Sequence, residues 1–136
     1  MKTKRISTVV ALLALALLVS ACDFSFSTAN IPNAFMAADH DGTQPTTTFR
    51  QDAVFYAIVD LANAPDDTTV KAAWIAVNAD GVEANFVIED VEITSGDGRI
   101  TFDLTNAPDM LWPLGQYRVD LYLNDELKTS LEFQVQ

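Results

Sequence analysis

The side chains that could carry out nucleophilic or acid–base chemistry are few in this sequence. A hydrolytic triad needs a nucleophile, a base and an orienting group in mutual contact. The chain has one histidine, His40, and one cysteine, Cys22. His40 stands in a loop among aspartates, and Cys22 follows an apolar N-terminal run. We therefore predict no catalytic residues and no enzymatic activity.

Two acidic segments have residue types that could bind a cation. Asp39-His40-Asp41-Gly42 offers oxygen and nitrogen ligands, but it lacks the repeating acidic ladder and distal glutamate of a calcium loop. A solvated turn is the favoured interpretation of this segment. The second set could bind calcium across a turn or supply the carboxylate pair of a glycosidase; it consists of Glu89, Asp90, Glu92 and Asp97. Surface charge explains this set better, so no metal and no cofactor are predicted.

The N-terminus has the order of parts of a secretory signal. Lys2, Lys4 and Arg5 precede an apolar run over residues 9–19, which ends at the small residues Ser20 and Ala21. A membrane-spanning helix needs about 20 apolar residues, and this run is shorter. Residues 1–21 are therefore predicted to be a helical signal peptide that is cleaved.

The four residues Val19-Ser20-Ala21-Cys22 close this signal, and they resemble the lipobox of bacterial lipoproteins. The resemblance implies that the sulfur of Cys22 receives a diacylglycerol and that the protein is anchored in the bilayer on the extracytoplasmic side of the cell membrane. An aspartate after the cysteine, here Asp23, resembles an inner-membrane retention signal in enterobacteria-like hosts; in hosts with one membrane it has no such meaning. The sorting therefore stays open.

Composition limits the remaining chain to one acidic domain. Removal of residues 1–21 leaves 115 residues, with five basic and nineteen acidic side chains and a formal charge of −14. Nucleic acid is an unsuitable partner because its phosphates require a basic surface. Anionic headgroups would repel this domain, so the lipid must hold it at the membrane. We assign residues 22–33 to a lipidated tether and residues 34–136 to the domain.

The domain reads as a series of short strands separated by turns, without an amphipathic helix. Asp41-Gly42, Asp80-Gly81, the segment 95–98 and Asn124-Asp125 are the turn signals. The apolar positions change phase near Glu89, which indicates a β-bulge or a step between sheets. About seven such strands predict an all-β protein with one antiparallel β-sandwich. The predicted strands cover residues 34–38, 53–61, 69–78, 82–93, 100–104, 117–123 and 127–135.

Several residues point to the immunoglobulin-like version of this sandwich. Trp74 lies on the third predicted strand, and Gly115-Gln116-Tyr117-Arg118-Val119 resembles the Gly-x-Tyr-x-Cys stretch of immunoglobulin domains, with Val119 in place of cysteine. The resemblance implies a tyrosine corner at Tyr117. Segments 112–117 and 133–135 also resemble the Trp-Pro-x-Gly-x-Tyr and Phe-x-Val ends of immunoglobulin-like domains in bacterial envelope and surface proteins.

Two surfaces are candidates for binding. Met110, Leu111, Trp112 and Leu114 form an apolar loop that either plugs the end of the sandwich, which we favour, or contacts a partner. Val54, Tyr56 and Ile58 point away from the core if Phe55, Val59 and Leu61 point into it, unless other chain covers them. The predicted binding residues are Val54, Tyr56, Ile58, Trp112 and Tyr122. The predicted function is a noncatalytic interaction or adhesion module for an envelope protein or extracellular ligand; the alternative is a small-molecule or cation receptor that uses the acidic loops.

Overall fold

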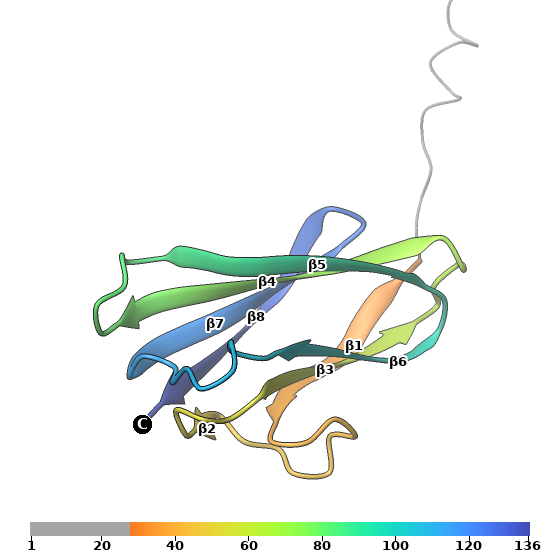
Figure 1. The fold of residues 1–136 in the computed structure, drawn as a ribbon. Coiled ribbons are helices and arrows are strands. Elements are labelled where there is room, and N and C mark those ends of the chain that lie inside the picture. The colour runs from red at the N-terminus through yellow and green to blue at the C-terminus, as the bar shows by residue number, and fades with distance from the viewer. Residues whose placement is uncertain (1–27) are drawn as a thin grey trace, which may run out of the picture.

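The computed structural model describes residues 28–136, which fold into eight β-strands (Figure 1). The predicted signal peptide, Cys22 and the first part of the tether lie outside the described residues. No helix that could span a membrane is found among residues 28–136. The strands are β1 (Asn30–Ala37), β2 (Thr48–Phe49), β3 (Phe55–Ala62), β4 (Thr68–Ala79), β5 (Phe86–Ser95), β6 (Gly98–Leu104), β7 (Gly115–Leu123) and β8 (Glu126–Val135).

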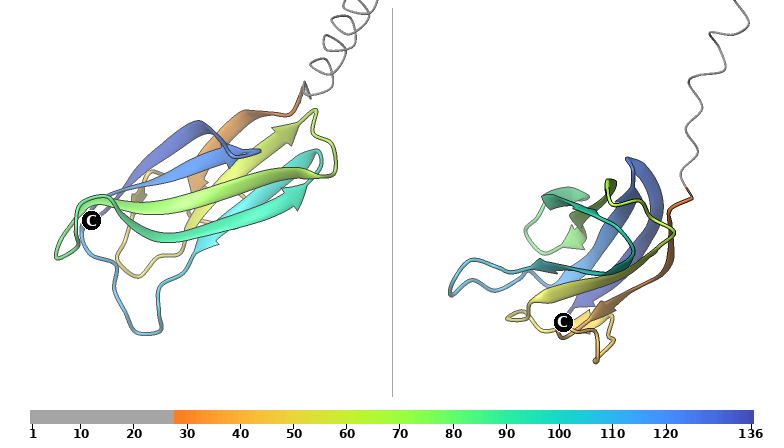
Figure 2. Two further views of the ribbon diagram at one scale, coloured as in Figure 1. Left: turned by 90° about the horizontal axis from the view of Figure 1, so that it is seen from above. Right: turned by 90° about the vertical axis from the view of Figure 1, so that its right-hand side faces the viewer.

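The strands form two sheets that face each other, which confirms the predicted β-sandwich (Figure 2). One sheet has the order β1-β3-β6 and the other β2-β8-β7-β4-β5. The strand pairs are antiparallel except β2 with β8, which run parallel. The two-residue strand β2 is additional to the seven predicted strands. Strand β1 begins at Asn30, so residues 30–33, assigned above to the tether, belong to the first sheet.

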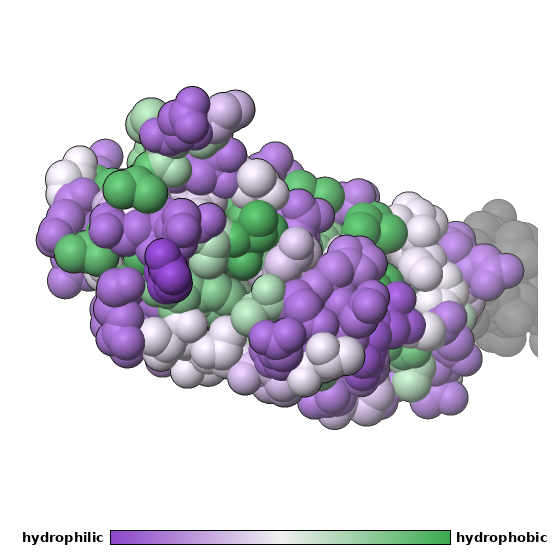
Figure 3. Space-filling model, turned by 60° about the horizontal axis from the view of Figure 1, so that its bottom comes forward, coloured by the Kyte–Doolittle hydropathy of each residue, from purple (hydrophilic) through white to green (hydrophobic). Residues whose placement is uncertain are grey.

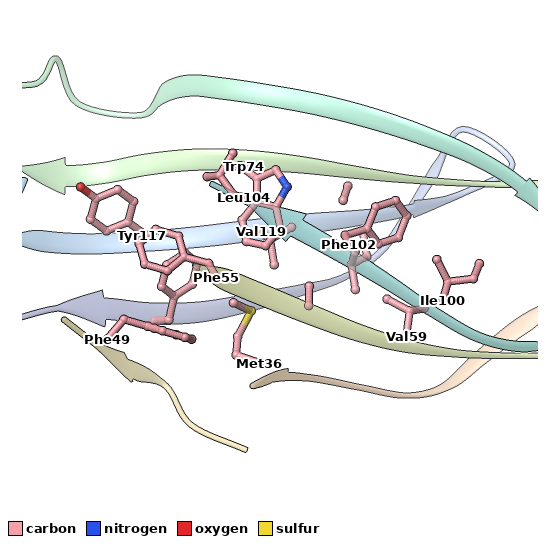
Figure 4. Close-up of a cluster of buried hydrophobic side chains, with 14 of the residues drawn as sticks. Met36, Phe49, Phe55, Val59, Trp74, Ile100, Phe102, Leu104, Tyr117 and Val119 are labelled. Atoms are coloured by element: carbon pink, nitrogen blue, oxygen red, sulfur yellow. The ribbon is translucent and has the colours of Figure 1, made fainter. Parts of the chain in front are cut away.

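The alternation of side chains along the strands separates core from surface. In β4, Val70, Ala72, Trp74 and Ala76 are buried in the space between the sheets. Phe55 from β3 and Tyr117 from β7 reach the same core from both sides (Figure 4). Each large apolar side chain that is fully buried contributes about 1.5–3 kcal/mol. This core stabilises the sandwich without a disulfide, because the chain has a single cysteine.

A β-bulge interrupts β5 where the phase change was predicted. Trp74 of β4 pairs with Glu89, and the next residue, Ile75, pairs with Val87, so Ile88 is the extra residue. Residues directly across from each other on antiparallel strands share a face of the sheet. The bulge therefore places Glu89 on the inner face of the sheet, the same face as Trp74.

Tyr117 forms the tyrosine corner that the sequence resemblance implied. Its hydroxyl donates a 2.7 Å hydrogen bond to the carbonyl oxygen of Pro113. Burial raises the pKa of the Tyr117 phenol, with a smaller contribution from the negative charge of Asp80, and both favour the protonated hydroxyl that donates this bond. The bond fixes the connection between β6 and β7 against the end of the core.

Candidate binding surfaces

The outer face of the three-stranded sheet is covered by the loop over residues 38–47. A Cβ placed on Gly42 would lie 3.0 Å from Cγ1 of Ile58, and the hydroxyl of Thr101 donates a 3.1 Å hydrogen bond to the carbonyl oxygen of His40. The His40 ring meets the Tyr56 ring edge-on, with 6.1 Å between the centroids. Ile58 is consequently 0% exposed. We withdraw it from the predicted binding residues, because a partner cannot reach it in this structure.

Val54 and Tyr56, the other two residues of that predicted face, are half-buried. Val54 precedes β3 and lines a cavity with Ala53, Met110 and Leu111. Tyr56 keeps only part of its ring exposed beside His40. The predicted sheet face is therefore not an open apolar surface.

Asp39 holds the covering loop in shape. Its carboxylate accepts hydrogen bonds from the hydroxyl of Thr43 at 2.7 Å and from the backbone N–H groups of Thr43 and Gln44 at 3.1 and 2.8 Å. The Thr43 hydroxyl bond is the main reason that the pKa of Asp39 is lowered. Both carboxylate oxygens of Asp39 are thus used within the loop, which acts as a turn.

Trp112 is a core residue rather than a surface residue. It is 6% exposed, and its ring stacks on Phe55 with 4.9 Å between the centroids. Its indole N–H donates to the carbonyl oxygen of Ala53 at 2.9 Å, and its backbone N–H donates to that of Gln51 at 2.8 Å. Trp112 therefore plugs the sandwich end, as predicted, and it is not a binding residue. The same prediction is wrong for Met110, Leu111 and Leu114, which are exposed.

Other apolar side chains at this end of the sandwich remain exposed. Met110 is 60% exposed and Leu111 is 59% exposed, while Leu114, Phe86 and Val87 are between 41% and 54% exposed. Their segments meet at one end because the N–H of Asp80 bonds to the carbonyl oxygen of Leu114 and β5 begins directly after the same turn. Hydrophobic residues are visible at the left end of the molecule in Figure 3. We call Phe86, Val87, Met110, Leu111 and Leu114 the apolar end.

The opposite end receives the N-terminal segment, and we call it the tether end. The hydroxyl of Thr28 donates to the carbonyl oxygen of Asn63 there, and the backbone N–H of Ala64 donates to the carboxylate of Asp97 at 2.7 Å. Tyr122 is near this end, on the outer face of the five-stranded sheet, with Nζ of Lys71 4.5 Å from its ring centroid. The predicted binding residues thus lie on separate surfaces.

The structure also separates the predicted acidic cluster. Glu89 lies on the inner face of β5, whereas Asp90 and Glu92 pair with Ala73 and Lys71 on the outer face. Asp97 is in the next turn and accepts the Ala64 hydrogen bond. Within residues 28–136, no group of three or more histidine, cysteine, aspartate or glutamate side chains could hold a metal ion.

Phe86 and Val87 were not among the predicted binding residues. Phe86 shares its parity with Ala84 and Ile88 and so resembles a core position in the sequence, whereas Val87 has the opposite parity and pairs with Ile75 on the outer face. Phe86 and Val87 are exposed because β5 is the last strand of its sheet and Phe86 is its first residue.

Neither protein-family models nor curated protein sequences yield a match to this chain. Solved structures do share its fold. An immunoglobulin-like protein from Pseudomonas aeruginosa superposes with a TM-score of 0.53 at 14% identity over 83% of this chain and 100% of that one. An alkylpurine DNA glycosylase AlkC from Pseudomonas fluorescens, bound to DNA with an abasic site analog, has a TM-score of 0.53 at 17% identity over 81% of this chain.

This chain spans only 31% of the glycosylase chain. At these identities the likeness concerns the fold alone. The described residues therefore form an immunoglobulin-like β-sandwich, as the sequence predicted, with eight strands in two sheets.

Proposed function

We propose that this protein is a noncatalytic binding module, held at the extracytoplasmic side of the cell membrane by a lipid on Cys22, which contacts an envelope protein or an extracellular ligand. The observation that carries the proposal is the position of the apolar end. It lies at the opposite end of the sandwich from the tether end, where Thr28, the first described residue, contacts Asn63. Cys22 precedes Thr28 by six residues in the sequence.

The charges at the tether end support this orientation. Asp66, Asp67, Asp97 and Asp125 lie in the turns of this end and are exposed. Anionic headgroups repel such a surface. The tether end would therefore stand off the bilayer on its short tether, and the apolar end would point away from the membrane toward a partner.

The exposed side chains support the same surface. Large exposed apolar patches on small proteins commonly mark contact sites, because burying them against a partner removes them from water. Met110 and Leu111 are the most exposed of the large hydrophobic residues that the structure describes. Trp112 and Tyr117 hold the backbone of this loop in place from below, so the surface is preorganised.

The surroundings of His40 support a noncatalytic role. Its ring contacts Asp41 at 3.3 Å and is largely exposed, and the nearby hydroxyl of Thr101 donates to the backbone of His40 rather than to its ring. A nucleophile–base pair requires a hydrogen bond between hydroxyl and imidazole. The described residues provide no such pair at His40.

The test is a pull-down from detergent-solubilised membranes of the native host with tagged full-length protein. We expect a specific partner with the wild-type chain, and its loss when Met110 and Leu111 are both changed to serine. Leu127→Ser is the matched control, because Leu127 is 51% exposed but lies in β8 beside the turn after β7, near the tether end. Equal recovery with the Met110/Leu111 double variant would refute the assignment of the surface.

The lipid anchor needs a separate measurement. Cells grown with a labelled fatty acid should incorporate the label into the wild-type protein and not into Cys22→Ala. Label in the alanine variant, or none in the wild type, would contradict the proposed anchor.

A further inference from the structure

Strand β5 leaves one edge of the five-stranded sheet open. It is the last strand in the order β2-β8-β7-β4-β5, it is 10 residues long, and it pairs along one side only, with β4. Backbone groups on the other side of an edge strand are free to pair with a further strand. The neighbouring strand in the sequence, β6, belongs to the other sheet. The sandwich is therefore open along the side between β5 and β6.

A groove of about 390 Å³ runs along this open side. Val91 and Ile93 of β5 pair with Ala72 and Val70, so they point inward and are half-buried at the groove. Phe102 of β6 borders the same groove from the other sheet but is only 2% exposed. A strand added to β5 would place every second side chain beside Val91 and Ile93.

Four carboxylates lie along this open side of the sandwich. Asp90 and Glu92 lie on the outer face of the sheet, and Glu89 and Asp103 are at the rim of the groove. None of the ion pairs within residues 28–136 involves these four carboxylates. Lys71, directly across from Glu92, places its ammonium group over the Tyr122 ring instead. The edge is therefore acidic, and no ion pair among the described residues neutralises these carboxylates directly.

The other cations of the described chain are also engaged. Arg50, Arg99, Arg118 and Lys128 contact Asp52, Asp60, Asp120 and Glu126, respectively. A second copy of this acidic chain would bring carboxylates against the β5 carboxylates and be repelled. The carboxylates along this edge therefore favour a partner with basic side chains. The free backbone edge and the inward-facing Val91 and Ile93 favour a partner segment in extended conformation.

We propose that β5 binds an extended segment of a partner protein in which apolar and basic residues alternate, added to the sheet as a further strand. The apolar side chains pack on Val91 and Ile93, and the basic side chains lie beside Asp90 and Glu92. Backbone hydrogen bonds provide affinity in this mode and the alternating pockets provide specificity. The site lies along the side of the sandwich, so it goes beyond the proposed contact at the apolar end.

The test uses the full chain in a neutral detergent and a peptide of alternating valine and lysine as long as β5, which has 10 residues. We expect saturable binding with changes in the backbone amide NMR signals of residues 86–95. The same peptide methylated on every backbone nitrogen keeps its charge but loses the backbone donors along both edges. It should not bind, and a peptide with valines and lysines in separate blocks should bind weakly.

Protein variants test the charges. Asp90→Lys and Glu92→Lys should each weaken binding of the alternating peptide about tenfold, because each replaces an attraction by a repulsion. Asp66→Lys and Asp125→Lys change the net charge equally in turns at the tether end and should leave binding nearly unchanged. Circular dichroism confirms that each variant is folded.

Three results would overturn the proposal: no binding of the alternating peptide, equal binding of the methylated or block peptide, or equal loss in the tether-end variants. The last two would show attraction by net charge alone. The peptide test and the pull-down can give different answers, because they change different residues. Asp90→Lys and Glu92→Lys alter the β5 edge and leave Met110 and Leu111 of the apolar end unchanged.

Discussion

Gly115 begins β7 at the closest approach of this strand to β4, and its replacement by alanine tests how the two strands are packed. Its φ is 149°, and it pairs with Ala79. A Cβ at this position would overlap the carbonyl oxygen of Asn78 and lie 2.6 Å from Cα of Ala79. Both neighbours are backbone atoms, so rotation of a side chain cannot relieve the overlap, and the two strands would have to separate.

Gly98 provides the matched control, because it has a similar backbone but open space around it. Its φ is 134°, and a Cβ there would meet nothing within 4 Å. Gly98→Ala should therefore cost only the conformational penalty, about 1–3 kcal/mol. Gly115→Ala adds an overpacking cost of about 1–3 kcal/mol, for a total of about 2–6 kcal/mol. Single domains are stable by about 5–15 kcal/mol, so this loss is a large fraction of the total.

The assay is urea unfolding of the purified wild-type and variant proteins, followed by tryptophan fluorescence. We expect Gly115→Ala to lower the free energy of unfolding by at least about 1 kcal/mol more than Gly98→Ala does, with an unchanged denaturant slope. An equal loss for the two variants would refute the argument from close approach, because the two glycines differ in space rather than in backbone conformation.

The remaining predictions concern the plug, the corner and one ion pair. Trp112→Ala should lower stability by about 3–5 kcal/mol in urea unfolding, whereas Leu111→Ala should change it by less than about 0.5 kcal/mol; similar effects would contradict the plug. Tyr117→Phe should cost about 1 kcal/mol through the lost hydrogen bond to the carbonyl oxygen of residue 113, and a melting temperature equal to that of the wild type would show that this bond is dispensable. Arg99 donates two hydrogen bonds to Asp60, at 2.7 and 3.0 Å, and these hold the pKa of Asp60 below 3.8. A lowered folded-state pKa stabilises the protein above the unfolded-state pKa, and the gain is lost as the pH falls through the folded-state value, so the stability difference between wild type and Asp60→Asn should shrink below about pH 4. A difference independent of pH would show that the pair does not contribute through its charge.

The residue patterns predicted most of the strands because the alternation of buried and exposed side chains in a strand is visible over a few consecutive residues. Val70, Ala72 and Trp74 alternate with Lys71 and Ala73, so the sequence records which side chains of β4 share a face, and the structure buries the face with Trp74. The turn signals are also local, since glycine, asparagine and aspartate tolerate the backbone angles that turns require. The resemblance around Tyr117 predicted the corner hydrogen bond, which the structure confirms.

The candidate binding surface was less predictable, because burial of an outward-facing residue depends on chain far away in the sequence. Ile58 has outward parity, but the loop carrying Gly42 covers it. Trp112 belongs to a loop whose other apolar residues are exposed, yet its ring stacks on the ring of Phe55 in the core. Alternation states which face of a strand a side chain is on. It does not state what lies on that face.

For this chain, the sequence by itself determined the all-β class, the turns, the acidic surface and the phase change in β5, because each depends on residue type and on spacing over a few positions. Only the tertiary structure decided the parallel pairing of β2 with β8, the cover over Ile58, the apolar end and the open acidic edge of β5. These features arise where segments distant in sequence meet or fail to meet. Each such contact depends on the residues of two segments that are distant in the chain, so the local pattern of either segment does not predict it.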